Sequence, residues 1–276
     1  MWIRCSLGAV FVLMLLGAFV LEPQPQRSLL GAPNHGTRLR LLSWNIGYGD
    51  LESDTRARQE DLPAVAQIIL SSDPDAVALQ ELTGEDQLKV LLSHLQERYS
   101  GYVSSFGSAD RICAVLVRDR NARFNDVLAG DKFAAAATFH LKRGLPEILL
   151  ISAHADAFSS SRRRTFVADV TDWVQGHTNS EIAFIAGDFN FEVSIKNKSN
   201  LFTDNVKHDS EAYSYISKYF RDLGRDAGET AINDRRIDYV FGPREGVTLR
   251  RVEVLRGTAI GHMDHWPLLV ELDLNG

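Results

Sequence analysis

The side chains best suited to chemistry lie in two short segments of the sequence. One reads Gly187-Asp188-Phe189-Asn190, and the other, near the end of the chain, contains Asp264-His265. Carboxylate and amide oxygens bind hard divalent cations, while an imidazole next to an acid can transfer a proton or stabilise charge. Asp188 and Asn190 are expected on one face of an extended segment, because strand side chains alternate with a period of two. These residue types are the ones that a metal-assisted hydrolase requires.

Four more polar candidates lie next to or inside apolar segments. Three of them also have a plain structural interpretation: Asn45 can satisfy a turn, Glu81 can begin a helix, and a lone histidine such as His154 can be hydrogen-bonded in a core. Asp238 is different, because it interrupts the apolar segment 237–241, where an unpaired charge is costly. We therefore expect Asp238 to pair with an imidazole.

The elements that must position these side chains are short apolar segments and amphipathic stretches. Strands are expected at 38–44, 76–79, 112–117, 147–153, 182–186, 237–241 and 268–272. Helices are expected at 62–70, 85–99 and 163–175. This order predicts an α/β or α+β sandwich. Several of the candidates directly follow an expected strand, and converging strand ends are where a sheet builds a site.

Composition predicts one domain. A chain of 276 residues with 45% hydrophobic content can bury one sizeable core, and its middle contains no linker-like segment. The formal net charge of −6 gives no general attraction for polyanions. Cys5 lies in the N-terminal apolar segment and Cys113 in an expected strand, so no disulfide within the domain is expected and the redox compartment stays open.

The N-terminal segment, residues 1–22, is predicted to be a signal peptide or a membrane anchor. Arg4 precedes the uncharged segment 5–21, whose length lies between those of a signal-peptide core and a full span. Bulky residues at 19–21 offer no sharp cleavage site, which favours a retained anchor with Arg4 on the cytoplasmic side. Residues 23–36 would be a polar tether. The catalytic domain, 37–276, is then expected outside the cytoplasm, either anchored to the membrane or secreted.

In order along the chain, five separated motifs resemble those of the endonuclease/exonuclease/phosphatase superfamily. That superfamily includes deoxyribonuclease I, abasic-site endonucleases, neutral sphingomyelinases and inositol-polyphosphate 5-phosphatases. The motifs are Ser-Trp-Asn45, Leu-Gln-Glu81, His154, Gly-Asp188-x-Asn190 and Asp264-His265. The resemblance covers residues 38–274. It implies a four-layer sandwich in which two packed, mostly antiparallel sheets are flanked by helices.

The expected cofactor is Mg²⁺, with Mn²⁺ as an alternative. Mg²⁺ is held in proteins by a few carboxylate or amide oxygens and keeps several waters. Glu81 and Asn45, with Asp264 nearby, are the expected ligands. Met263 stands where the family usually has serine, which is a minor departure because that hydroxyl is not a metal ligand.

The resemblance also implies catalytic roles. His154 is similar to the histidine that lies against the scissile phosphate, and Asp188 to the aspartate that orients or deprotonates water. Asn190 would hold a phosphate oxygen or the metal. Asp238 resembles the acid that orients the final histidine, so His265 is expected to be a general base or an electrostatic contact to phosphate.

A phosphodiester substrate is expected, with nucleic acid favoured over lipid. A histidine at 154, where abasic-site enzymes carry tyrosine, points away from that branch. The stretch 191–215 is polar and short, without the aromatic hairpin of a lipid-inserting sphingomyelinase. Arg162 and Arg163 could hold substrate phosphates, although a solvated helix face is the plain alternative. We predict a monomeric phosphodiesterase. Sphingomyelinase-like or inositol-phosphate activity, or a non-catalytic surface binding module on the same fold, are the alternatives.

Overall fold

The computed structural model describes residues 37–47, 59–105, 112–142, 144–177, 182–193, 203–258, 260 and 263–275. The expected signal or anchor at 1–22 and the tether at 23–36 lie outside these ranges. Within them, no helix is long and apolar enough to cross a membrane.

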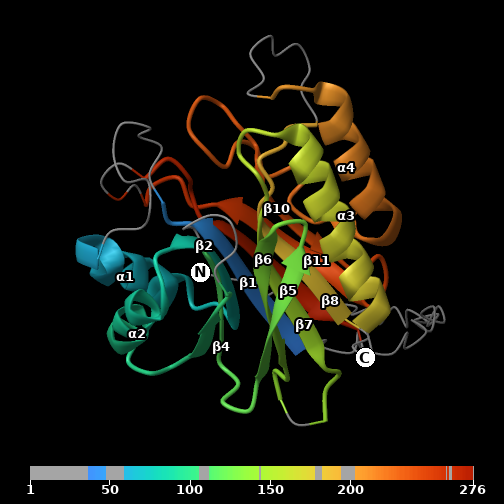
Figure 1. The fold of residues 1–276 in the computed structure, drawn as a ribbon. Helices are drawn as coiled ribbons and strands as arrows, with labels where there is room; N and C mark the ends of the chain where they lie inside the picture. The colour runs from blue at the N-terminus through green and yellow to red at the C-terminus, as the bar shows by residue number, and fades with distance from the viewer. Residues whose placement is uncertain are drawn as a thin grey trace, which may run out of the picture. The chain divides into compact units, whose positions relative to one another are not determined.

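The described residues form two six-stranded sheets (Figure 1). The first sheet contains β1 (Thr37–Asn45), β2 (Ala76–Leu82), β3 (Ser100–Val103), β4 (Ile112–Val117), β11 (Val247–Val254) and β12 (Leu268–Leu274). The second contains β5 (Arg123–Ala129), β6 (Lys132–Phe139), β7 (Ile148–His154), β8 (Ile182–Asp188), β9 (Arg221–Asp222) and β10 (Asp238–Gly242). Their orders are β11-β12-β1-β2-β4-β3 and β5-β6-β7-β8-β10-β9.

Each sheet contains one parallel pair of strands in an otherwise antiparallel arrangement. The parallel pairs are β1 with β2 and β7 with β8, and the remaining neighbours run antiparallel. Because the two strands of a parallel pair end at the same edge, each sheet brings two strand ends together there. Mostly antiparallel sheets were expected, and this is confirmed.

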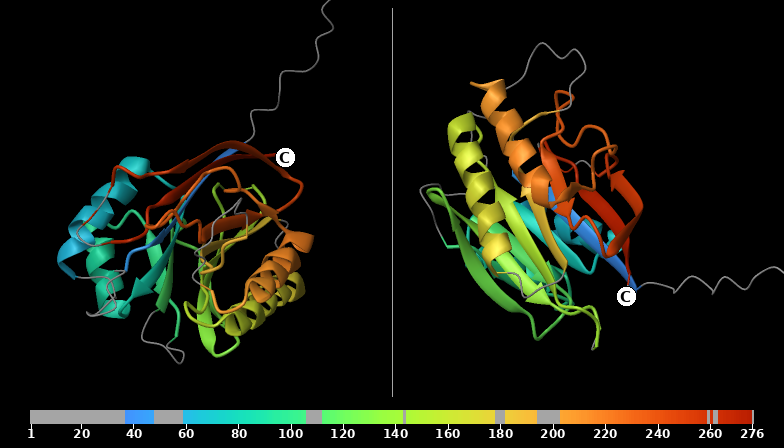
Figure 2. Two further views of the ribbon diagram at one scale, coloured as in Figure 1. Left: turned by 90° about the horizontal axis from the view of Figure 1, so that it is seen from above. Right: turned by 90° about the vertical axis from the view of Figure 1, so that its right-hand side faces the viewer.

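Helices cover the outer face of each sheet. A short 3-10 turn (Gln59–Asp61) leads into α1 (Leu62–Ser72), which with α2 (Glu85–His94) lies against the first sheet. Helices α3 (Ser160–His177) and α4 (Val206–Tyr219) lie side by side on the second sheet (Figures 1 and 2). The four-layer sandwich implied by the sequence is thereby confirmed.

The central strands are buried on both faces, as β1 illustrates. Leu39 and Leu41 belong to the apolar cluster between the two sheets, whereas Leu42 and Trp44 belong to the cluster beneath α1 and α2. A polar link also lies deep between the sheets, because Gln80 Nε2 of β2 donates to Ser152 Oγ of β7 at 2.9 Å. Aliphatic burial of this extent is the main stabilising contribution to such a fold.

The second expected helix is shorter than its sequence pattern indicates. It was expected to span 85–99 but ends at His94, because Gln96 and Glu97 adopt left-handed backbone angles with φ of 56° and 53°. The chain then turns into β3. The structure also adds β3, β5, β6, β9, β11 and α4 to the expected elements.

Candidate active site

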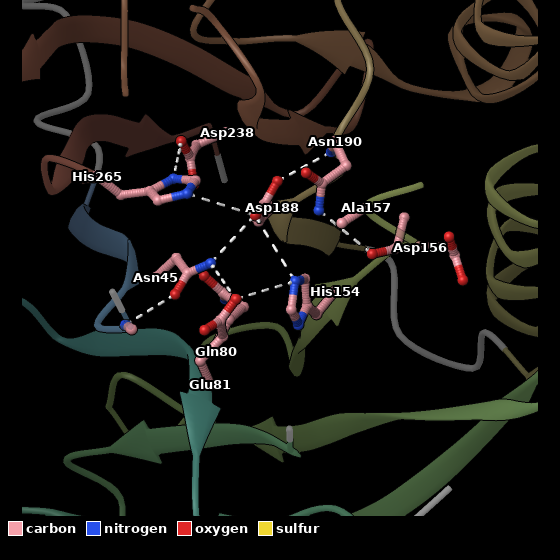
Figure 3. A network of polar contacts seen from close by, with 12 residues as sticks. Asn45, Gln80, Glu81, His154, Asp156, Ala157, Asp188, Asn190, Asp238 and His265 are labelled. Carbon is pink, nitrogen blue, oxygen red and sulfur yellow. Dashed lines mark hydrogen bonds and ion pairs between the residues drawn. The ribbon is translucent and has the colours of Figure 1, made fainter. Parts of the chain in front are cut away.

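The candidate residues meet at one end of the sandwich, where β1, β2, β7 and β8 end and β10 begins (Figure 3). Strand register places them. His154 lies opposite Asp188 across the β7–β8 pair, and Asp238 lies opposite Asp188 on its other side across β8–β10. The second sheet therefore delivers His154, Asp188 and Asp238 as adjacent positions on three neighbouring strands.

The first sheet contributes Asn45 and Glu81. Asn45 Nδ2 donates to Glu81 Oε1 at 3.2 Å and to Asp188 Oδ2 at 3.1 Å, while its Oδ1 accepts from the Gly47 amide at 2.9 Å. Glu81 has φ of 66° at an irregularity in the β2–β4 pairing. Positive φ in a non-glycine residue stores strain, and such bulges redirect side chains near functional sites. Here the irregularity accompanies a buried carboxylate whose Oε1 lies near His154 Nε2 of the second sheet.

Asp188 and Asn190 are close neighbours, but the extended geometry expected for them is wrong. Strand β8 ends at Asp188, and Asn190 adopts φ of 53°, a left-handed angle that asparagine tolerates. The backbone amide of Asn190 turns back to donate to Asp188 Oδ1 at 2.9 Å, and its Nδ2 donates to Ala155 O at 3.3 Å. A turn, and not a shared strand face, keeps the two side chains together.

Gly187 allows β7 and β8 to approach each other at the site. Its φ is 149°, and a Cβ at this position would lie 1.9 Å from Ala153 O on β7. Any side chain would therefore overlap the neighbouring backbone. This close contact explains on steric grounds why the Gly-Asp-x-Asn motif has glycine at this position.

Asp238 and His265 form the expected pair. His265 Nδ1 lies 2.9 Å from Asp238 Oδ2, so the ring donates to this buried carboxylate. Burial raises the pKa of Asp238, an effect that His265 opposes. Burial alone would lower the pKa of His265, but the carboxylates of Asp238 and Asp188 outweigh it and raise that pKa to about 10. The Trp44 indole also donates to His265 O at 3.2 Å, which fixes the backbone that carries the ring.

The second nitrogen of His265 and the ring of His154 both face Asp188. His265 Nε2 lies 3.6 Å from Asp188 Oδ2, and His154 Nε2 lies 3.7 Å from the same oxygen. His154 Nε2 is also 3.6 Å from Glu81 Oε1. Two imidazoles and two carboxylates thus surround one small polar region, from opposite sheets.

Metal-ligand geometry within the described ranges is found at Asp188, Asp238 and His265, whose ligand atoms lie within 4.8 Å of one another. This group differs from the expected set of Asn45, Glu81 and Asp264. Asp264 lies beside it, with Oδ1 3.9 Å from His265 Nε2, and burial raises its pKa while His265 opposes that effect.

The two arginines expected to hold substrate have different environments. Arg162 is exposed on α3 and pairs with Asp131 at 2.9 Å. Arg163 is fully buried and donates from Nε and Nη2 to the two carboxylate oxygens of Asp209, at 2.8 and 3.0 Å. Consecutive helix positions point about 100° apart, so Arg162 can be exposed while Arg163 is buried. The substrate role expected for Arg163 is therefore wrong, because its guanidinium is committed inside the protein.

One polar side chain near the site was not singled out by the sequence. Lys132 begins β6, and its Nζ donates to His154 O and Ala155 O at 3.3 Å each. The signal that drew attention to Asp238 was also available here, because Lys132 is a charged residue that opens the apolar segment 132–139.

Comparison with known proteins identifies the family to which the fold belongs. The chain matches the endonuclease/exonuclease/phosphatase family over residues 42–260. No curated protein sequence matches it. A solved endonuclease/exonuclease/phosphatase from Bacteroides vulgatus has a TM-score of 0.66 at 18% identity, covering 86% of this chain and 99% of that chain.

Two other similar structures come from individually named proteins. The catalytic domain of human Nocturnin, with a bound sulfate anion, has a TM-score of 0.63 at 19% identity and covers 86% of this chain and 94% of its own. A mannosyl-6-phosphatase from Bacteroides thetaiotaomicron has a TM-score of 0.62 at 18% identity, with coverages of 85% and 99%. At these identities the likeness is one of fold. Because the family match spans most of the chain, the protein belongs to the endonuclease/exonuclease/phosphatase family, whose fold is generally that of hydrolases acting on phosphoester bonds.

Proposed function

We propose that this protein is a Mg²⁺-dependent phosphodiesterase that acts on nucleic acid in preference to lipid. The observation that carries the proposal is the contact of Asp188 with groups from both sheets, namely Asn45, His154 and His265. Phosphodiester hydrolysis needs a positioned water, charge stabilisation on the non-bridging oxygens and help for the leaving oxygen. Buried acids, an amide and two imidazoles can supply these functions at one point.

The donor set suits a hard divalent cation. Glu81, Asp188 and Asp238 are all buried carboxylates, and burying negative charge is costly unless cations balance it. Mg²⁺ prefers such oxygens, and when bound it would polarise the phosphate and lower the pKa of a bound water. Glu81 is the first proposed ligand, with Asn45 and Asp264. In the structure Asn45 points its NH₂ group at the carboxylates of Glu81 and Asp188. To bind the cation, its amide would rotate by half a turn so that Oδ1 faces the ion.

The remaining side chains have roles that follow from their contacts. Asp188 would orient or deprotonate the attacking water, and Asn190 would hold a phosphate oxygen. His154 would protonate the leaving oxygen or donate to phosphate from Nε2. His265, held at Nδ1 by Asp238, offers Nε2 to the same region and would act as an electrostatic contact or as a general base. Its raised pKa favours a protonated ring, which suits the electrostatic contact, and the general-base role would require a bound cation to lower that pKa.

The substrate preference rests on charge and exposure. Arg162 is 60% exposed on its side chain and pairs with Asp156 as well as with Asp131, close to the turn that follows His154. It could exchange these acids for a backbone phosphate of a polynucleotide. Binding of DNA should then weaken as salt rises, and Arg162→Ala should reduce the log–log salt slope by about one.

An activity panel on the full chain tests the proposal. We expect DNA or RNA to be cleaved with Mg²⁺, and cleavage to stop with excess chelator and in Asp188→Asn. Sphingomyelin, inositol phosphates and a sugar phosphate serve as the alternative substrates. If one of these compounds is hydrolysed and nucleic acid is not, the class of that compound replaces nucleic acid as the proposed substrate. Absence of turnover on all of them, with ligand binding retained, would favour a non-catalytic binding module.

We further propose export or membrane anchoring through residues 1–22. The support is the uncharged segment 5–21 after Arg4. A chain that stays in the membrane fraction after an alkaline wash would be anchored, and a shortened chain in the medium would be secreted. Recovery of the full-length chain in the soluble cytosolic fraction would contradict both.

A further inference from the structure

Lys132 lies behind the candidate site as a half-buried cation at the first position of β6. Burial lowers the pKa of its amine, an effect that the nearby carboxylates of Asp156 and Asp188 oppose. An ammonium removed from water is costly unless its donors are used. Lys132 Nζ donates to the carbonyls of His154, the last residue of β7, and Ala155, the residue after it. We call this point, where the chain leaves β7, the His154–Ala155 turn.

That turn is the structural junction between His154 and Asn190. The Ala155 amide donates to Asp188 O at 2.9 Å, which ties the turn to the end of β8. Ala155 O accepts from Lys132 Nζ and also from Asn190 Nδ2, each at 3.3 Å. The carbonyl of His154 itself is the second acceptor of Lys132. Any movement of this turn therefore shifts both side chains relative to Asp188.

We propose that Lys132 is a positioning residue, which holds the His154–Ala155 turn so that His154 and Asn190 point into the site. The inference rests on the proposed phosphodiesterase function of the same site. Hydrogen bonds from a charged donor are stronger than neutral ones, so an ammonium holds two carbonyls more firmly than a neutral group does. Precision matters here, because a displacement of about 1 Å can cost about 10²-fold in rate.

Two substitutions separate positioning from general stability. In Lys132→Met the side chain keeps its length and loses its donors, so with Mg²⁺ and bis(4-nitrophenyl) phosphate we expect kcat to fall about tenfold or more. KM and the Mg²⁺ concentration for half-maximal rate should stay near wild type. Lys132→Arg keeps a cationic donor and should recover part of the rate. Lys207→Met, at an exposed lysine of α4, is the control and should be unchanged.

A double substitution tests whether Lys132 acts through the shared carbonyl. If Lys132 positions Asn190 through Ala155 O, the loss in Lys132→Met with Asn190→Ala should be smaller than the product of the two single losses. Losses that simply multiply, or a Lys132→Met enzyme with wild-type kcat, would overturn the proposal.

A crystal structure of Lys132→Met decides the matter independently of turnover. We expect a displaced His154–Ala155 turn and a lost contact between Asn190 Nδ2 and Ala155 O. An unmoved turn refutes positioning, even if kcat falls. If the wild-type protein hydrolyses no phosphodiester, the proposed function fails, and the position of the turn in this crystal structure still supports or refutes the role of Lys132.

Discussion

Asn45 and Asp188 join the two sheets at the candidate site through a hydrogen bond of 3.1 Å between Asn45 Nδ2 and Asp188 Oδ2. Asn45 ends β1 in the first sheet, and Asp188 ends β8 in the second. The same amide nitrogen contacts Glu81 Oε1, so one neutral group separates two buried carboxylates. The geometry of the site therefore depends on how the two sheets pack. Asn45 both links the sheets and separates the carboxylates of Glu81 and Asp188.

Asn45→Asp should make the fold depend on divalent cation. The new carboxylate would lie beside Glu81 and Asp188, and close like charges in a buried site are unfavourable. We expect a lower Tm than wild type in chelator and a larger rise of Tm on adding Mg²⁺, because an ion that binds only the folded state stabilises it. Asn45→Ala adds no charge and should show a smaller Mg²⁺-induced rise than wild type. Equal Mg²⁺ responses in all three proteins would contradict a metal at this position.

The four histidine variants His154→Ala, His265→Ala, His94→Ala and His177→Ala should fall into two classes. His154 and His265 are buried against Asp188, and removing either should lower kcat of the folded protein by about 10² or more. His94 and His177 lie exposed at the ends of α2 and α3, and their removal should have little effect. Steady-state measurement of kcat for the four variants on one diester substrate tests this division. Similar losses in all four variants would remove the catalytic assignment.

The central strands could be predicted from sequence because burial on both faces makes them continuous apolar segments. Strands β4, β7 and β8 are fully buried and were expected nearly at their observed bounds. Strand β11 buries only Val247 and exposes Thr248, Arg250 and Arg251, so it has no such signal. Helix α4 begins with an Asn205 cap inside a polar stretch that reads as a loop. The elements that were missed therefore lie at sheet edges or on the outer surface, except for β6. That strand is in the interior of its sheet, but its run of alanines at 134–137 is a weak strand signal.

The candidate site could be predicted in its residue types and in one contact, but not in the contacts between the two sheets. The motifs brought Asp188 and His265 to attention, and the cost of a buried charge predicted that Asp238 pairs with an imidazole. The family resemblance then implied that this imidazole is His265. The Asn45–Asp188 contact could not be derived, because it requires the relative placement of two sheets. Arg163 was misplaced for a related reason: a run of arginines at a helix start does not reveal which one points inward.

Gly187→Ala should disrupt the site through backbone overlap. The added Cβ would lie 1.9 Å from Ala153 O, so β7 and β8 must separate. Overpacking costs about 1–3 kcal/mol or more, and we expect a large drop in Tm together with loss of activity. Gly176→Ala, on α3 with open space around the added methyl, is the matched control and should be neutral or slightly stabilising. A Gly187→Ala protein with wild-type Tm would mean that this strand contact is not tight.

Arg163→Met should destabilise the protein and leave substrate binding unaffected in the folded fraction. The substitution leaves the buried Asp209 carboxylate without its partner, which typically costs about 3–5 kcal/mol. Replacing Asp209 by leucine in the same protein should recover part of the stability. Arg162→Met, on the exposed neighbour, should change stability by less than about 0.5 kcal/mol. Urea unfolding of the four proteins measures the difference, and a stable Arg163→Met with weakened DNA binding would restore the substrate role.

The final prediction separates the two acids next to His265. Asp238 accepts from His265 Nδ1 at 2.9 Å, whereas Asp264 is 22% exposed on its side chain and lies beside Nε2 at 3.9 Å. Asp238→Asn keeps the shape but removes the charge that orients the ring, so kcat should fall strongly while the Mg²⁺ dependence stays near wild type. Asp264→Asn should instead raise the Mg²⁺ concentration needed for half-maximal rate. Because Asp238 also lies in the Asp188–Asp238–His265 group, the opposite pattern is informative: a large loss of metal affinity in Asp238→Asn would place the ion there and exclude Asp264 as its ligand.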